Sequence, residues 1–181
     1  MTAQPHSGDC FINGKWVPGD GAPFQKTCPA SGEVVWTGRA ASTAQTGQAV
    51  EAARTAFDAW GQTNLSTRQA ALERYAEEIR LRKEAMALAI SRDMGKLLKE
   101  AGIEVDTMIA KIAVSIKAQA DRAGEHSLPV DFGHLDLTHR PHGVMAVFGP
   151  YNFPGHLPNG HIVPALLPGN TCVFKASELA P

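Results

Sequence analysis

The chain has 181 residues, of which 44% are hydrophobic and 19% charged, with a formal net charge of −1. This composition suits a folded domain with its own core and is not typical of a disordered chain. The small net charge excludes a broad basic surface for nucleic acid or anionic lipid, and no apolar run approaches the roughly 20 residues that span a bilayer. We therefore expect neither a nucleic-acid nor a membrane partner.

The N-terminus and the cysteines indicate a protein of the cytoplasm. Met1–Cys10 is polar and lacks the apolar stretch of a secretory signal. The three cysteines are an odd number without Cys-x-x-Cys spacing, which argues against a disulfide framework and a zinc site. His156 and His161 are five residues apart and would not share a helix face. We expect a soluble cytoplasmic protein with no metal.

The first 40 residues are predicted to form extended segments joined by turns. Asn13-Gly14, at the centre of Phe11–Val17, is a hairpin turn signal. Glu33–Thr37 is predicted to be a second short strand, introduced by Ser31-Gly32.

Three amphipathic helices are predicted next. Ser42 and Ser66, each followed three residues later by glutamine, are the expected N-caps of the first two. The second is expected to end at Gly95 and the third near Gly124. Apolar residues at helical spacing form three expected core stripes. These are Val50, Ala53, Phe57 and Trp60; Leu72, Tyr75, Ile79, Met86 and Ile90; and Leu98, Ala101, Val105, Met108, Ile112 and Ile116.

The pattern changes after Pro129. Asp131–Arg140 alternates loosely and is expected to be an exposed strand or hairpin arm. Gly143–Phe148 is apolar throughout, which is typical of a strand buried on both faces in a parallel sheet. Thr171–Phe174 is a second such run, and the apolar residues between the two suit a crossover helix, so we predict a βαβ unit. Since two parallel strands alone leave unpaired edges, we expect a truncated fold.

The loop after the first of these strands is a candidate site. Ligands of open α/β sheets bind beyond the carboxyl ends of the strands. Pro150 and Pro154 fix the backbone on either side of Asn152. A rigidly held amide donor is what an oxyanion hole requires. The alternative is that Asn152 only caps the following turn or helix.

A cation and a carboxylate follow the second strand. Lys175 and Glu178 are spaced to hydrogen-bond the two hydroxyls of a ribose. The alternative is a solvated surface pair of little energetic weight.

Together these motifs resemble the aldehyde dehydrogenase superfamily. Pro150–Pro154 is similar to its Pro-Trp-Asn-Phe-Pro motif, with Tyr151 in place of tryptophan. Lys175–Pro181 is similar to its Lys-Pro-Ser-Glu-x-Thr-Pro segment, and Leu166–Thr171 to the approach to its second strand. The resemblance covers essentially the whole chain, with departures at Tyr151, Pro168, Ala176 and Ala180. Within the superfamily, Tyr151–His161 is similar to the N-succinylglutamate 5-semialdehyde dehydrogenases of bacterial arginine catabolism.

The resemblance implies an α/β fold, a truncated Rossmann-type NAD-binding domain with N-terminal helices and a β-hairpin oligomerisation arm. Residues 1–128 would form the N-terminal strands and helices, 129–142 the arm, and 143–181 the first βαβ unit, with the catalytic domain absent. The arm implies a homo-oligomer in the full-length enzyme.

The resemblance also implies roles for single residues. Asn152 would stabilise the oxyanion, and Lys175 and Glu178 would hold the adenosine ribose. The Glu178 carboxylate would disfavour a 2′-phosphate, so NAD is expected rather than NADP. The residues expected to line the nicotinamide side are Phe148, Gly149, Pro150 and Tyr151.

In the family reaction a cysteine thiolate attacks the aldehyde, hydride passes to the nicotinamide, and glutamate-activated water releases the carboxylate. None of the three cysteines lies in the family's nucleophile motif, and Cys172 falls in a strand predicted to be buried. We therefore expect a fragment of a dehydrogenase that by itself oxidises no aldehyde. The alternatives are a naturally short, non-catalytic protein that binds nucleotide or pairs with subunits, and an unrelated α/β module.

Overall fold

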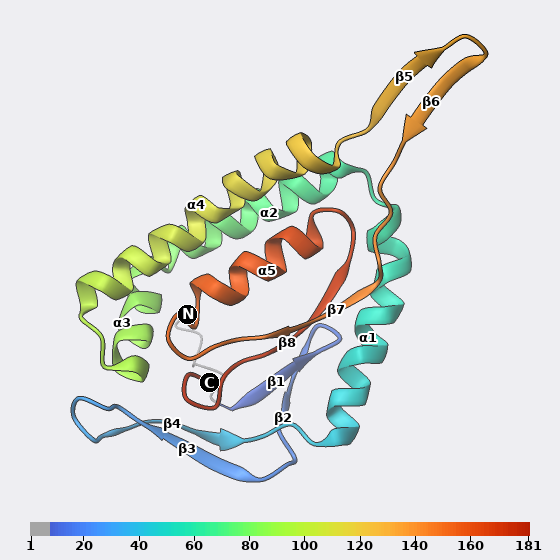
Figure 1. Ribbon diagram of the computed structural model, residues 1–181. Helices are drawn as coiled ribbons and strands as arrows, with labels where there is room; N and C mark the ends of the chain where they lie inside the picture. The colour runs from blue at the N-terminus through green and yellow to red at the C-terminus, as the bar shows by residue number, and fades with distance from the viewer. Residues whose placement is uncertain (1–7) are drawn as a thin grey trace.

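Four two-stranded sheets and five helices make up residues 8–181, the part of the chain described by the structure, a computed structural model (Figure 1). Most of Met1–Cys10, which we expected not to be a secretory signal, lies outside the described residues. The strands are β1 (Asp9–Ile12), β2 (Lys15–Pro18), β3 (Pro23–Thr27), β4 (Val34–Arg39), β5 (His126–Val130), β6 (Gly133–Leu137), β7 (Val144–Phe148) and β8 (Thr171–Lys175). The helices are α1 (Thr43–Gln62), α2 (Leu65–Leu81), α3 (Lys83–Met94), α4 (Leu98–Ala123) and α5 (His156–Leu166).

Two antiparallel hairpins open the chain. Asn13 and Gly14 both have positive φ, 50° and 73°, and form the two-residue turn between β1 and β2. This confirms the predicted hairpin. The strand predicted at Glu33–Thr37 corresponds to β4, which pairs with β3. Strand β3 was not predicted, because Pro23 opens it and polar residues fill most of it.

The predicted start of α1 is confirmed. The Ser42 hydroxyl accepts from the Gln45 amide at 3.2 Å, and the Gln45 side chain accepts from the Ser42 amide at 3.1 Å. This reciprocal pair satisfies two amides that have no partner within the helix.

The prediction for the second helix was wrong in two respects. Its N-cap is Asn64, whose side-chain oxygen accepts from the Thr67 amide at 2.8 Å, whereas Ser66 lies inside α2. A break at Arg82 then separates α2 from α3. The apolar stripe runs through both helices with little change of phase, so periodicity cannot reveal this break. The expected end at Gly95 is confirmed by its left-handed φ of 66°.

The helices supply the main core. Its buried members come from α2, α3, α4 and α5 and from the residue that follows α5, and α5 lies between α4 and the β7–β8 pair (Figure 1). They are Leu72, Ile79, Ala87, Ile90, Ala101, Val105, Met108, Ile112, Val163 and Leu167. Helix α4 is therefore the element against which α5 is fixed.

Strands β5 and β6 form an antiparallel hairpin that projects away from the other elements (Figure 1). We call this hairpin, residues 126–137, the arm. Pro129, at which our division started the arm, lies inside β5 opposite His134.

The predicted βαβ unit is confirmed. Strands β7 and β8 are parallel, with Val144 opposite Thr171 and Phe148 opposite Lys175, and α5 connects them. The expectation that both runs are buried on two faces was wrong for the described residues. Phe148 is 73% exposed and Phe174 is 45% exposed, because α1 and α5 pack against the pair without covering these side chains.

Candidate functional site

Two candidate segments leave the same edge of the β7–β8 pair. Phe148 lies opposite Lys175, and the Gly149 amide donates to the Lys175 carbonyl at 2.9 Å. The chain after β7 leads to Asn152, and the chain after β8 leads to Glu178. The register thus brings both segments to one strand edge, where ligands of open α/β sheets bind.

The first residue of the loop after β7, Gly149, packs closely against β8 and α5. A Cβ atom at Gly149 would lie 2.9 Å from the Phe174 ring and 3.2 Å from Pro158 Cγ. A larger residue here would therefore require the Phe174 side chain to shift and would press against Pro158. The N-cap residue of α5 is Gly155, which has no side chain of its own to cap the helix. The alternative in which Asn152 caps the following helix is therefore wrong, and its exposed side chain is available to a ligand.

A buried carboxylate holds the end of this loop. Glu104 Oε1, on α4, accepts from the amides of Gly155 at 2.9 Å and His156 at 3.1 Å. Lys96 Nζ lies 2.8 Å from Glu104 Oε2 and donates to the Asn152 carbonyl, also at 2.8 Å. We did not predict these contacts. A glutamate beside Ala101, Val105 and Met108 in a core stripe was the signal that could have revealed them.

The other end of α5 is held by donors. Trp60 Nε1 donates to the Leu166 carbonyl at 3.0 Å, and Arg68 Nε donates to the Leu167 carbonyl at 2.8 Å. Burial lowers the pKa of Arg68, although the guanidinium stays charged at neutral pH. A carboxylate at the N-terminus of α5 and a cation at its C-terminus both suit the helix dipole.

The pair after β8 is open to solvent. Lys175 Nζ lies 3.3 Å from Glu178 Oε2, and the two side chains are 62% and 73% exposed. A backbone hydrogen bond, together with the hydrogen bond and the charge of Lys175, lowers the pKa of Glu178. The carboxylate is therefore ionised at neutral pH and can accept hydrogen bonds from hydroxyl groups.

A hollow of about 390 Å³ lies beside the Asn152 loop, and neither Lys175 nor Glu178 lines it. It is bounded by Lys96, Glu100, Ile103, Glu104, Thr107, Asn152, Phe153 and His156. A compound that enters it from solvent can therefore reach the Asn152 side chain.

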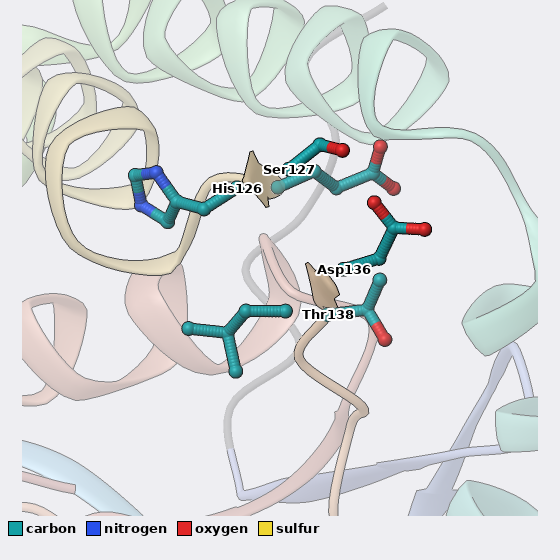
Figure 2. Close-up of a pocket in the computed structure, with 6 residues that line it drawn as sticks. His126, Ser127, Asp136 and Thr138 are labelled. Atoms are coloured by element: carbon teal, nitrogen blue, oxygen red, sulfur yellow. The ribbon is translucent and has the colours of Figure 1, made fainter. Parts of the chain in front are cut away.

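A second hollow, of about 480 Å³, lies at the base of the arm. Figure 2 shows the side chains of Ser127 and Asp136 on one side of the hairpin and that of His126 on the other. Because its lining residues alternate between two faces, they cannot converge on one ligand. We do not assign it to the site.

The cysteines do not provide an activated thiol at this edge. Burial raises the pKa of Cys172, in the middle of β8, to about 11. Burial and two nearby aspartates raise the pKa of Cys10 in β1, whereas hydrogen bonds from Ser31 and its neighbourhood lower the pKa of Cys28. Among residues 8–181, no cluster of histidine, cysteine and acidic side chains could hold a metal, and no helix is long and apolar enough to cross a membrane.

A family model described as "Aldehyde dehydrogenase family" matches residues 16–181. The chain belongs to the aldehyde dehydrogenase family. It is 53% identical to the N-succinylglutamate 5-semialdehyde dehydrogenase of Chromobacterium violaceum and 54% identical to that of Escherichia coli O139:H28, in each case over 171 residues. These matches cover 94% of this chain and 35% of each relative, so the chain spans about a third of their length. The likeness to this branch, expected from Tyr151–His161, is confirmed.

Solved structures show the same fold. An aldehyde dehydrogenase from Brucella melitensis biovar abortus matches with a TM-score of 0.90 at 27% identity, over 100% of this chain and 38% of its own. The NADP-dependent glyceraldehyde-3-phosphate dehydrogenase from Bacillus halodurans, complexed with NADP, matches with a TM-score of 0.88 at 27% identity, over 96% and 38%. Betaine aldehyde dehydrogenase from Staphylococcus aureus, in complex with NAD+, matches with a TM-score of 0.85 at 28% identity, over 94% and 35%. These likenesses confirm the predicted α/β aldehyde dehydrogenase fold.

Proposed function

We propose that this chain supplies the oxyanion donor and the ribose-binding pair of an NAD-dependent dehydrogenase that oxidises succinylglutamate semialdehyde to succinylglutamate. The observation that carries the proposal is the register of β7 and β8, which brings the Asn152 loop and the Lys175–Glu178 pair to one edge. The names of the relatives that are 53% and 54% identical support the choice of substrate.

In this proposal Asn152 acts on the aldehyde. Its exposed amide borders the hollow of about 390 Å³, so a carbonyl entering that hollow can accept a hydrogen bond from it. The developing oxyanion accepts this bond more strongly than the ground-state carbonyl does, which lowers the barrier to addition and to hydrolysis. A well-aimed donor of this kind contributes about 3–4 kcal/mol.

The strand edge suits the adenosine ribose of NAD. Glu178 is an ionised acceptor and Lys175 an adjacent donor, which together match two vicinal hydroxyls. The negative charge of Glu178 would repel a 2′-phosphate, which supports NAD over NADP. When bound, NAD accepts the hydride from the substrate. Phe148 through Tyr151 would line the nicotinamide side.

We assign the nucleophile and the general base to residues outside these 181. A nucleophilic cysteine must be a thiolate near neutral pH, and the buried Cys172 does not meet this need. Cys10 and Cys28 lie on or beside the N-terminal hairpins. We therefore expect the 181-residue polypeptide alone to oxidise no aldehyde.

We further propose that the arm makes subunit contacts in a homo-oligomer. Leu128 lies opposite Leu135, and Leu137 lies on the same face. All three are more than half exposed. An apolar face on a projecting hairpin is suited to burial against another subunit.

The test uses the intact protein, by which we mean the full-length enzyme of which we propose this chain to be a part. It follows NADH formation with succinylglutamate semialdehyde. We expect Asn152→Ala to lower kcat about 10²–10³-fold, whereas Asn64→Ala, at an exposed helix cap, leaves kcat unchanged. Glu178→Gln should raise kcat/KM with NADP relative to NAD. A wild-type protein that reduces neither cofactor with this aldehyde would refute the proposal.

A further inference from the structure

We propose that Lys96 and Glu104 are positioning residues that fix the Asn152 loop and so aim its amide at the oxyanion. The inference rests on the proposed function in one respect, the role of Asn152 as the donor. We call Asn152–His156 the donor loop. Side chains from outside this loop contact it at both ends.

Glu104 holds the C-terminal end of the donor loop. Its side chain is only 1% exposed, and each carboxylate oxygen has a partner. Oε1 accepts from the amides of Gly155 and His156, and Oε2 faces Lys96. A buried carboxylate that lost its cation would be strongly destabilised, so each member of the pair keeps the other in place.

Lys96 holds the N-terminal end of the donor loop. Its ammonium donates to the Asn152 carbonyl at 2.8 Å and to Glu104 at the same distance. It also lies 4.5 Å from the centroid of the Phe153 ring, a cation–π contact. One cation therefore fixes the backbone of Asn152 and the side chain of the next residue.

At Gly155 the donor loop packs directly against α4. A Cβ atom at Gly155 would lie 2.6 Å from Met108 Sδ, so the backbone already touches the helix that carries Glu104. Met108 and Glu104 belong to the buried face of α4. The ion pair thus connects the donor loop to the buried face of α4.

A role in positioning differs from a role in stability alone. A donor that is displaced by about 1 Å loses about 100-fold in rate. If Glu104 only capped α5, its loss would change the free energy of unfolding and leave kcat unchanged. If the pair positions the donor loop, its removal should speed amide exchange at that loop and lower kcat, and KM should stay unchanged.

The experiment compares Lys96→Met, Lys96→Arg and Glu104→Gln with Lys99→Met, which removes an exposed lysine from the first turn of α4. In the intact protein, amide hydrogen exchange is measured at Gly155 and His156, with Val105 and Val163 as core references. We expect Lys96→Met and Glu104→Gln to speed exchange at the two loop amides about 10-fold and to leave the core unchanged. In the same variants kcat should fall about 10- to 100-fold at similar KM. Lys96→Arg keeps the positive charge, so it should show smaller changes in exchange and in kcat than Lys96→Met. Lys99→Met should change neither the exchange nor kcat.

Two results would overturn the inference. One is unchanged exchange at Gly155 and His156 in both Lys96→Met and Glu104→Gln. The other is faster exchange at the core references by the same factor, which would make the pair a general stabiliser. If the wild-type protein oxidises no aldehyde, the proposed function fails, but the exchange measurement still decides whether the ion pair holds the donor loop.

Discussion

Replacing Asn170 with alanine should loosen the start of the βαβ unit. The Asn170 side-chain oxygen accepts from the amides of His142 at 2.6 Å and Gly143 at 3.0 Å, and its nitrogen donates to the Ala165 carbonyl at 3.0 Å. Asn170 is 5% exposed. One side chain therefore joins the chain before β7 to the end of α5.

The expected loss of unfolding free energy depends on which backbone groups are left without a hydrogen-bond partner. The Ala165 carbonyl keeps the Asn170 backbone amide at 3.1 Å, so Asn170→Ala leaves only the two amides at 142 and 143 without an acceptor. An unsatisfied buried group costs about 1–3 kcal/mol, and of the two amides only that of Gly143 is buried, since His142 is exposed to water; we therefore expect the variant to lose about 2 kcal/mol of unfolding free energy. Urea unfolding of the intact protein measures this loss. Asn64→Ala is the matched control, because it removes an exposed helix cap at a cost of about 1 kcal/mol. A loss at Asn170 no larger than the loss at Asn64 would refute the reasoning.

Three further predictions concern other parts of the chain. Cys172, with its pKa raised to about 11, should be alkylated about 100-fold more slowly than an ordinary thiol near neutral pH. Its alkylation rate should rise as the pH approaches 11. Mass spectrometry after timed labelling measures both, and an ordinary rate at neutral pH or a rate independent of pH would contradict the prediction. Gly14→Ala should cost about 1 kcal/mol because φ is 73°, whereas Gly47→Ala, inside α1 with open space at Cβ, should stabilise by about 0.5–1 kcal/mol; urea midpoints that move in the same direction would contradict this. Leu135→Asp on the arm should reduce the oligomeric mass of the intact protein in light scattering, and an unchanged mass would exclude the arm from the subunit contact.

Local signals in the sequence predicted those parts of the fold that depend on neighbouring residues. Asn13-Gly14 fixes its own turn, and Ser42 with Gln45 fixes the start of α1. The two apolar runs around the Asn152 loop predicted the parallel pair. These features require no knowledge of distant residues, which is why they were predicted correctly.

Features that depend on distant partners were missed. The Gly155 amide that donates to Glu104 lies 51 residues away along the chain, and the Leu167 carbonyl that accepts from Arg68 lies 99 residues away, so no local pattern reports these contacts. The exposure of Phe148 depends on what packs against β7, which an apolar run does not reveal. The break at Arg82 lies inside a continuous apolar stripe.

The central claim is that the Asn152 loop and the Lys175–Glu178 pair serve one nicotinamide dinucleotide site. A crystal structure of the intact protein with NAD bound tests it most directly. We predict the adenosine ribose hydroxyls on Lys175 and Glu178, with the nicotinamide end along Phe148–Tyr151 and toward the Asn152 side chain. NAD bound with its ribose away from the ends of β7 and β8 would contradict the account.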